Sequence, residues 1–216
     1  MAKQEIKQEH NVVEEAVGRS EAFFNKNWKK VTLVAAGVVV LFAACMAVSI
    51  WVVKPREQKA AEALFTGEKY FQDGNYETAL VEFEAVIADH KGTKAANLAE
   101  AYTGISLAKL GRYEEAIPML KAFKGDDAMV APSVLAALGN CYAQVGDEAQ
   151  AAATLVKAAN KADNNLLSPA YLIQAGQIYE KLGKKADALK AYEQIKTKYY
   201  GSMQANDIDK YIERVK

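Results

Sequence analysis

Side chains that could bind a metal or support catalysis are few and widely separated in this sequence. The histidines are His10 and His90, and the cysteines are Cys45 and Cys141, so no spacing typical of a zinc site is present. The sequence also has no glycine-rich phosphate loop and no Gly-x-Ser-x-Gly nucleophile elbow. These absences predict a protein with no cofactor, no metal site and no enzyme activity.

Two further features could still carry chemistry. Asp126 and Asp127 are adjacent carboxylates, the residue type used for general acid and base catalysis, but they fall in a predicted loop, where a solvated pair is the simpler interpretation. Cys141 stands beside Gly139 and Tyr142 in a recurring sequence position, which favours a small core residue over a reactive thiol. An enzyme with an unrecognised site remains the alternative, with Asp126, Asp127, His90 and Cys141 as its candidates.

The element that positions everything else is the apolar run from Val31 to Val53. It contains no charge and no proline, and as a helix it would be about 35 Å long, enough to cross a hydrocarbon core of about 30 Å. Trp28 and Trp51 stand near its ends, where aromatic rings suit the headgroup region. The run predicts a transmembrane helix, with a buried core helix as the alternative. Cys45 follows small residues as in a lipobox, but the apolar sequence continues after it, so we interpret it as an ordinary apolar cysteine.

Residues 1–30 are expected to form a polar N-terminal tail with a juxtamembrane helix from Ser20. The formal net charge of the chain is zero, so no basic surplus indicates a nucleic-acid partner. Basic residues flank both ends of the apolar run, and their distribution slightly favours a cytoplasmic N-terminus. They are Arg19, Lys26, Lys29 and Lys30 before the run, and Lys54, Arg56 and Lys59 after it.

The rest of the chain is a repeat with a period near 36 residues. Four copies align on a glycine that is followed five residues later by alanine and nine residues later by a bulky side chain. A second glycine stands seven residues before the first, and a tyrosine or leucine stands three residues after that second glycine. The aligned residues are Gly74, Gly111, Gly146 and Gly183; Ala79, Ala116, Ala151 and Ala188; Phe83, Leu120, Leu155 and Tyr192; Gly67, Gly104, Gly139 and Gly176; and Tyr70, Leu107, Tyr142 and Tyr179.

These spacings place the aligned residues on one face of each of two helices joined by a short turn. The glycine in the turn suits a left-handed residue that ends the first helix. The glycine inside the first helix is expected where a neighbouring helix approaches closely, since glycine otherwise costs a helix about 1 kcal/mol relative to alanine. The bulky residues are expected to fill the space left around these small ones.

The four units resemble tetratricopeptide repeats (TPRs). The segments that carry the resemblance are GEKYFQDGNYETALVEFEAVI, GISLAKLGRYEEAIPMLKAF, GNCYAQVGDEAQAAATLVKAA and GQIYEKLGKKADALKAYEQI. The predicted fold is therefore all-α: one transmembrane helix (31–53), a linker (54–61) and a TPR-like α-solenoid (62–216) of about four helical hairpins. A C-terminal capping helix with the apolar face Ile208, Tyr211, Ile212 and Val215 is expected to close the solenoid.

The resemblance implies an inner groove lined by the first helices of the repeats. The lysine and asparagine clamp that some TPR proteins use for carboxylates is missing apart from Asn140, so segments with apolar anchors fit better than acidic tails. The alternative is that these side chains only cover the core. The expected protein-binding residues are Leu64, Glu68, Phe71, Ala101, Ile105, Lys109, Ala136, Asn140, Gln144, Ile173, Gln177 and Lys181.

The layout and the segments GTKAANLAEAYTGISLAKLGRYEEAIPMLKAFK and DIDKYIERVK resemble the YfgM-type family of ancillary SecYEG translocon subunits. That resemblance implies a bacterial inner-membrane protein with a cytoplasmic N-terminus and periplasmic repeats. It implies, as partners, translocon subunits, periplasmic chaperones or exported chains. A structural scaffold of an envelope or division complex remains the alternative, and Ala43 and Ala47 weakly favour a homo-oligomer.

Overall fold

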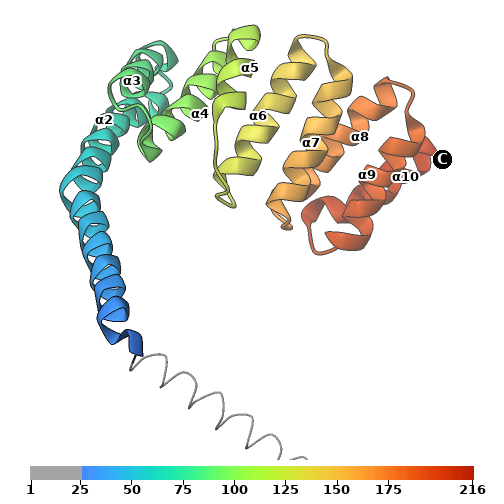
Figure 1. The fold of residues 1–216 in the computed structure, drawn as a ribbon. Coiled ribbons are helices and arrows are strands. Elements are labelled where there is room, and N and C mark those ends of the chain that lie inside the picture. The colour runs from blue at the N-terminus through green and yellow to red at the C-terminus, as the bar shows by residue number, and fades with distance from the viewer. Residues whose placement is uncertain (1–25) are drawn as a thin grey trace, which may run out of the picture. The chain divides into compact units, whose positions relative to one another are not determined.

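The computed structural model describes residues 26–216, and the chain divides into two units between Pro55 and Arg56, so residues 26–55 and residues 56–216 are described separately. The described residues are helical and contain no strand, so the predicted all-α class is confirmed. The expected tail helix beginning at Ser20 lies largely outside the described residues. Figure 1 labels the helices α2 to α10 that are used below.

The first unit holds the apolar run. Residues 26–48 are α-helical, and Ser49–Val53 (η1) continue as a short π-helix. The helical stretch Lys26–Gln72 is long and apolar enough to cross a membrane, and none of its most apolar 18-residue window is buried within the chain. A core helix of a soluble protein would be mostly buried, so this exposure favours the transmembrane interpretation over the core-helix alternative.

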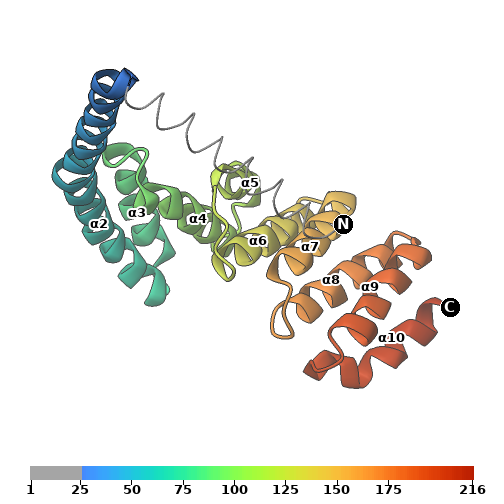
Figure 2. The same cartoon turned by 60° about the horizontal axis from the view of Figure 1, so that its bottom comes forward.

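The second unit is a solenoid of four helical hairpins that follow one another in an arc (Figure 1), an order that also holds in the turned view of Figure 2. Residues 54–61, the predicted linker, are the first two turns of α2. The hairpins are α2 (Lys54–Gln72) with α3 (Tyr76–Asp89), α4 (Lys94–Lys109) with α5 (Tyr113–Ala122), α6 (Val130–Gln144) with α7 (Glu148–Ala162), and α8 (Ser168–Lys181) with α9 (Lys185–Lys198).

Each hairpin closes with the same glycine turn. Gly74, Gly111, Gly146 and Gly183 have φ between 70° and 84°, which confirms the predicted left-handed residue. The amide after each glycine donates to the carbonyl five residues back, as in Asn75 N–H to Tyr70 O at 2.9 Å. This is the hydrogen bond of a Schellman motif, and each first helix ends two residues after the acceptor, as α2 ends at Gln72 after Tyr70.

The glycines inside the first helices confirm the close-approach interpretation. A Cβ added to Gly176 would lie 2.3 Å from a ring carbon of Tyr192, and one added to Gly67 would lie 2.5 Å from Phe83. Gly104 and Gly139 meet Leu120 and Leu155 in the same way. Each glycine is therefore the socket for the bulky side chain aligned in its own repeat, and the four alanines of the second helices are fully buried beside it.

The solenoid has two edges because successive helices are antiparallel. The turn edge consists of the four glycine turns, residues 73–75, 110–112, 145–147 and 182–184. The loop edge consists of the connections between hairpins and the one after α9, residues 90–93, 123–129, 163–167 and 199–202 (Figure 1).

The C-terminal end is capped as predicted. A 3₁₀ turn, η2 (Met203–Asp207), leads into α10 (Ile208–Val215), and Ile208, Ile212 and Val215 are buried against the last hairpin. The Arg214 guanidinium donates to both Glu180 carboxylate oxygens at 2.7 and 2.8 Å, and the Tyr192 hydroxyl donates to the same carboxylate at 2.5 Å. These bonds tie α10 to α8 and α9.

Candidate protein-binding surface

The residues with possible chemistry occupy structural positions. Asp127 accepts hydrogen bonds from the Met129 and Val130 amides at the start of α6, and these bonds lower the pKa of its carboxyl. Asp126 pairs with Lys161, whose ammonium lowers the pKa of that carboxyl. Both carboxylates are thus held ionised as loop residues, which is the opposite of what a general acid requires.

Cys141 is a core residue, as predicted. It is 1% exposed on α6, and burial raises the pKa of its thiol, so little reactive thiolate forms at neutral pH. His90 ends α3, where its amide donates to Val86 O. Within residues 26–216, no group of three His, Cys, Asp or Glu side chains is placed to hold a metal ion.

A hollow of about 480 Å³ lies among α4, α6 and α8. It brings together four residues of the expected groove: Ile105 and Lys109 from α4, and Asn140 and Gln144 from α6. Ala136, also expected in the groove, lines the hollow but is buried. We call this feature the α4–α6–α8 hollow.

The remaining expected groove residues are divided between core and surface. Leu64 and Ala101 are buried in the hydrophobic core, where their side chains support the fold. Glu68, Phe71 and Ile173 are half-buried, whereas Gln177 and Lys181 are exposed, with Lys181 paired to Glu148. None of these seven lines the α4–α6–α8 hollow.

The chemistry of the α4–α6–α8 hollow suits a peptide segment. Ile105, Ala108 and Ala137 give an apolar lining, and the amides of Asn140 and Gln144 can each donate to and accept from a peptide backbone. The Lys109 side chain is exposed and makes no ion pair or hydrogen bond with another residue of the described chain. The hollow therefore offers apolar contact, amide hydrogen bonding and one positive charge.

Sequence reasoning missed two tyrosines that line the same hollow. Tyr113 begins α5 and Tyr171 lies in α8, and both are half-buried. A signal for the first was present: the position two residues after the turn glycine is tyrosine in two of four repeats, at Tyr76 and Tyr113. No comparable repetition marks Tyr171, whose place depends on how the third and fourth hairpins pack.

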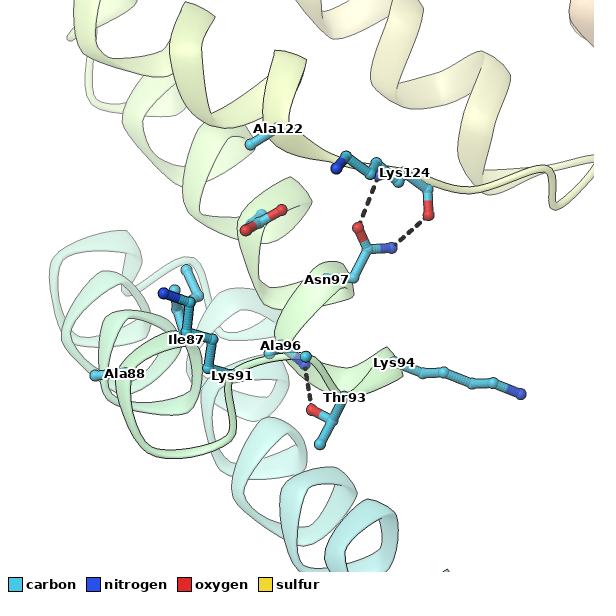
Figure 3. Close-up of a pocket in the computed structure, with 11 residues that line it drawn as sticks. Ile87, Ala88, Lys91, Thr93, Lys94, Ala96, Asn97, Ala122 and Lys124 are labelled. Atoms are coloured by element: carbon cyan, nitrogen blue, oxygen red, sulfur yellow. Dashed lines mark hydrogen bonds between the residues drawn. The ribbon is translucent and has the colours of Figure 1, made fainter. Parts of the chain in front are cut away.

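A second hollow, of about 750 Å³, lies where α3 ends, α4 begins and α5 ends (Figure 3). We call it the loop-edge hollow. Lys91, Lys94 and Lys124 line it, and Asn97 fixes its rim by accepting from the Lys124 amide and donating to the Lys124 carbonyl, both at 2.7 Å. The repeat pattern does not predict this hollow, because residues from two repeats form it.

Comparisons with known proteins define the class. Residues 170–202 match the tetratricopeptide repeat family model. No curated protein sequence matches the chain. The chain therefore carries a tetratricopeptide repeat, and its solenoid has the fold of tetratricopeptide repeat proteins, as solved structures show.

Three solved structures illustrate that fold. A TPR protein from Parabacteroides merdae is 15% identical, with a TM-score of 0.59, and the match covers 73% of this chain and 60% of that one. The nearly identical TPR-like repeats of a putative kinesin light chain from Podosopora anserina are 14% identical, with a TM-score of 0.56 and coverage of 74% and 85%. The MamA protein is 19% identical, with a TM-score of 0.53 and coverage of 72% and 89%.

Proposed function

We propose that this protein is a membrane-anchored adaptor that binds other proteins through its TPR solenoid. The observation that carries the proposal is the combination of an apolar helix whose most apolar window is not buried with a solenoid whose α4–α6–α8 hollow presents Lys109, Asn140 and Gln144. The helix supplies attachment to a bilayer and the hollow supplies a binding surface.

The partner segment is extended or helical and carries an apolar anchor. Its apolar side chain packs on Ile105 and Ala137, while its backbone bonds to the amides of Asn140 and Gln144. The groove residues outside the hollow that remain accessible, Gln177 and Lys181 among them, extend this surface toward the C-terminal end.

The resemblance to the YfgM-type family supports a finer proposal. The chain resides in a bacterial inner membrane with its N-terminus in the cytoplasm and its repeats in the periplasm, and it assists protein export at the Sec translocon or the transfer of chains to chaperones. A fixed scaffold of an envelope or division complex is the competing function, and the partner captured at the hollow distinguishes the two.

Site-specific photo-crosslinking in intact membranes tests the proposal. A photoreactive residue at Asn140 lies in the α4–α6–α8 hollow, and one at Glu114, exposed on α5 outside that hollow, is the matched control. Crosslinks to channel subunits or exported chains from Asn140 alone support the export function, and crosslinks to a fixed envelope complex support the scaffold. Equal crosslinking from both positions would contradict binding at the hollow.

Protease treatment of spheroplasts tests the orientation. The proposal expects the repeats to be cleaved when protease is added outside. Protection of the repeats until the membrane is lysed would place them in the cytoplasm and remove the periplasmic function.

A further inference from the structure

The loop edge of the solenoid carries exposed apolar side chains that the turn edge lacks. In residues 56–216, four of the six large apolar side chains that are mostly exposed belong to it or to the turn that follows it: Met129 (52%), Leu166 (72%), Tyr200 (78%) and Met203 (85%). The other two, Phe65 and Val81, lie on helices. Because the mostly exposed large apolar side chains outside helices belong to the loop edge or to the turn that follows it and none to the turn edge, the loop edge is the candidate for an apolar contact.

The same edge presents unpaired positive charge. Lys91, Lys94 and Lys124 line the loop-edge hollow, and none of them makes a side-chain ion pair or hydrogen bond with another residue of the described chain. Glu100 is the one acidic residue among those lining it.

The acidic residues of the loops are already engaged. Asp126 pairs with Lys161, and Asp127 accepts from backbone amides of α6. Asp163 lies 2.6 Å from the Lys198 ammonium and accepts a hydrogen bond from the Tyr199 hydroxyl at 3.0 Å. The lysines that remain available in the loop-edge hollow therefore favour an anionic partner.

Chain connectivity tethers one loop of this edge, the loop between α3 and α4, to the end of the apolar run. Arg56 donates to the Lys91 carbonyl at 2.7 Å, and the Glu57 carboxylate accepts from the Lys94 amide at 3.0 Å. Arg56 follows Val53 by three residues, which span at most about 11 Å even when fully extended. The loop between α3 and α4 is thus tethered through Arg56 to the chain that follows the apolar run, whatever angle the apolar helix adopts.

Hydrogen bonds and ion pairs join the loops in a row. Asn97 holds the backbone of Lys124, Asp126 pairs with Lys161 near the end of α7, and Asp163 joins the next loop to Tyr199. The loops that bear Met129, Leu166 and Tyr200 are therefore connected to the loop held by Arg56 and Glu57.

We infer that the loop edge lies on the surface of the bilayer that anchors the chain. Lys91, Lys94 and Lys124 bind anionic phospholipid headgroups, while Leu166, Tyr200 and Met203 enter the interfacial region, where apolar and aromatic side chains are stabilised. This inference rests on the membrane anchor of the proposed function. It orients the solenoid edge-on to the membrane and leaves the turn edge facing solvent.

Nitroxide accessibility in nanodiscs that hold one copy of the full chain tests the inference. Discs of phosphatidylcholine alone are compared with discs containing about 30% phosphatidylglycerol, an anionic lipid. Labels are placed by Met203→Cys or Leu166→Cys in a Cys45→Ala background, and Lys185→Cys beside the turn edge is the matched control. A label on native Cys45, which is exposed in the apolar run, reports insertion of the anchor, while buried Cys141 stays unlabelled.

On anionic discs, labels at 203 and 166 are expected to collide with lipid-soluble oxygen about two- to fivefold more than the label at 185. The triple variant Lys91→Gln, Lys94→Gln and Lys124→Gln, with unchanged helicity, is expected to lose this difference. Equal water exposure at 203 and 185 beside a lipid-exposed label at 45 would overturn the inference while leaving the anchor intact. A water-exposed label at 45 would refute the anchor itself. If the labels at 203 and 166 collided with oxygen as often on neutral discs as on anionic discs, the role of the lysines would be refuted.

Discussion

The apolar helix and the solenoid use the same kinds of apolar side chain in opposite ways. Leu41 and Phe42 in the helix are 68% and 67% exposed, whereas Phe83 and Leu155 in the solenoid are fully buried. The solenoid buries its apolar residues because each repeat alternates a glycine or alanine with a bulky partner. The apolar run has no such alternation and no polar face, and its most apolar window is not buried among the described residues, so it suits lipid.

The largest expected effect comes from removing a core side chain. Phe83→Ala empties the socket beside Gly67 and removes the ring that stacks on Tyr102 at 5.0 Å, so we expect unfolding free energy to fall by about 3–5 kcal/mol. Phe65→Ala is the matched control, because Phe65 is exposed and its loss should change stability by less than about 0.5 kcal/mol. Chemical denaturation measures the unfolding free energy of both variants. Equal losses of unfolding free energy would contradict the expected difference between a buried and an exposed phenylalanine.

A charge in the apolar run should affect the membrane without affecting the solenoid. Phe42→Lys places an ammonium near the centre of the run, where insertion becomes less favourable by about 3 kcal/mol. We expect a reduced membrane-inserted fraction and an unchanged melting temperature of the solenoid. Flotation and thermal unfolding report the two properties separately, and a lower melting temperature with normal insertion would show that this helix stabilises the solenoid by packing.

Adding a side chain at a buried glycine tests how closely the helices of the solenoid pack. Gly176→Ala would place a Cβ 2.3 Å from the buried Tyr192 ring, and we expect a loss of about 1–3 kcal/mol from the strain of overpacking. Gly201→Ala is the control, because its added Cβ meets Asn165 at an ordinary 3.6 Å. Thermal unfolding compares the two variants. Equal stability would mean that the close approach of Tyr192 is not the reason for glycine at position 176.

The smallest effect is a pH dependence at the capping helix. The Arg214 guanidinium, with a further hydrogen bond from Tyr192, lowers the pKa of Glu180 below its ordinary value of 4.5. A lowered folded-state pKa contributes stability that is fully present above the unfolded value and is lost as pH falls through the folded value. Glu180→Gln should therefore lower the melting temperature at pH 7, and the difference should shrink as pH falls below 4.5. If the difference in melting temperature persisted in acid, Glu180 would stabilise the fold by packing and not by its ion pair with Arg214.

The glycine positions of the solenoid could be predicted because their causes are local. Gly146 is required because the turn needs a left-handed φ. Gly139 is required because the side chain of Leu155, nine residues after the turn glycine, packs against it. The residues that line the groove were harder to predict, because the exposure of each side chain depends on how the hairpins stack. Leu64 and Ala101, which were expected in the groove, are buried by that stacking.

The features missed by sequence reasoning arise from contacts between repeats. Tyr171 reaches the α4–α6–α8 hollow from the fourth repeat, and Asn97 reaches Lys124 across 27 residues of chain. No periodicity marks such pairs, because each occurs once in the solenoid. The two hollows therefore depend on packing that the repeat pattern does not encode.

Alkaline extraction of membranes from cells that produce the full chain tests the central claim most directly. If residues 31–53 anchor the solenoid to a bilayer, the chain stays in the membrane pellet and floats with lipid after carbonate treatment. Release of the unprocessed chain into the carbonate supernatant as a monodisperse protein would contradict the claim.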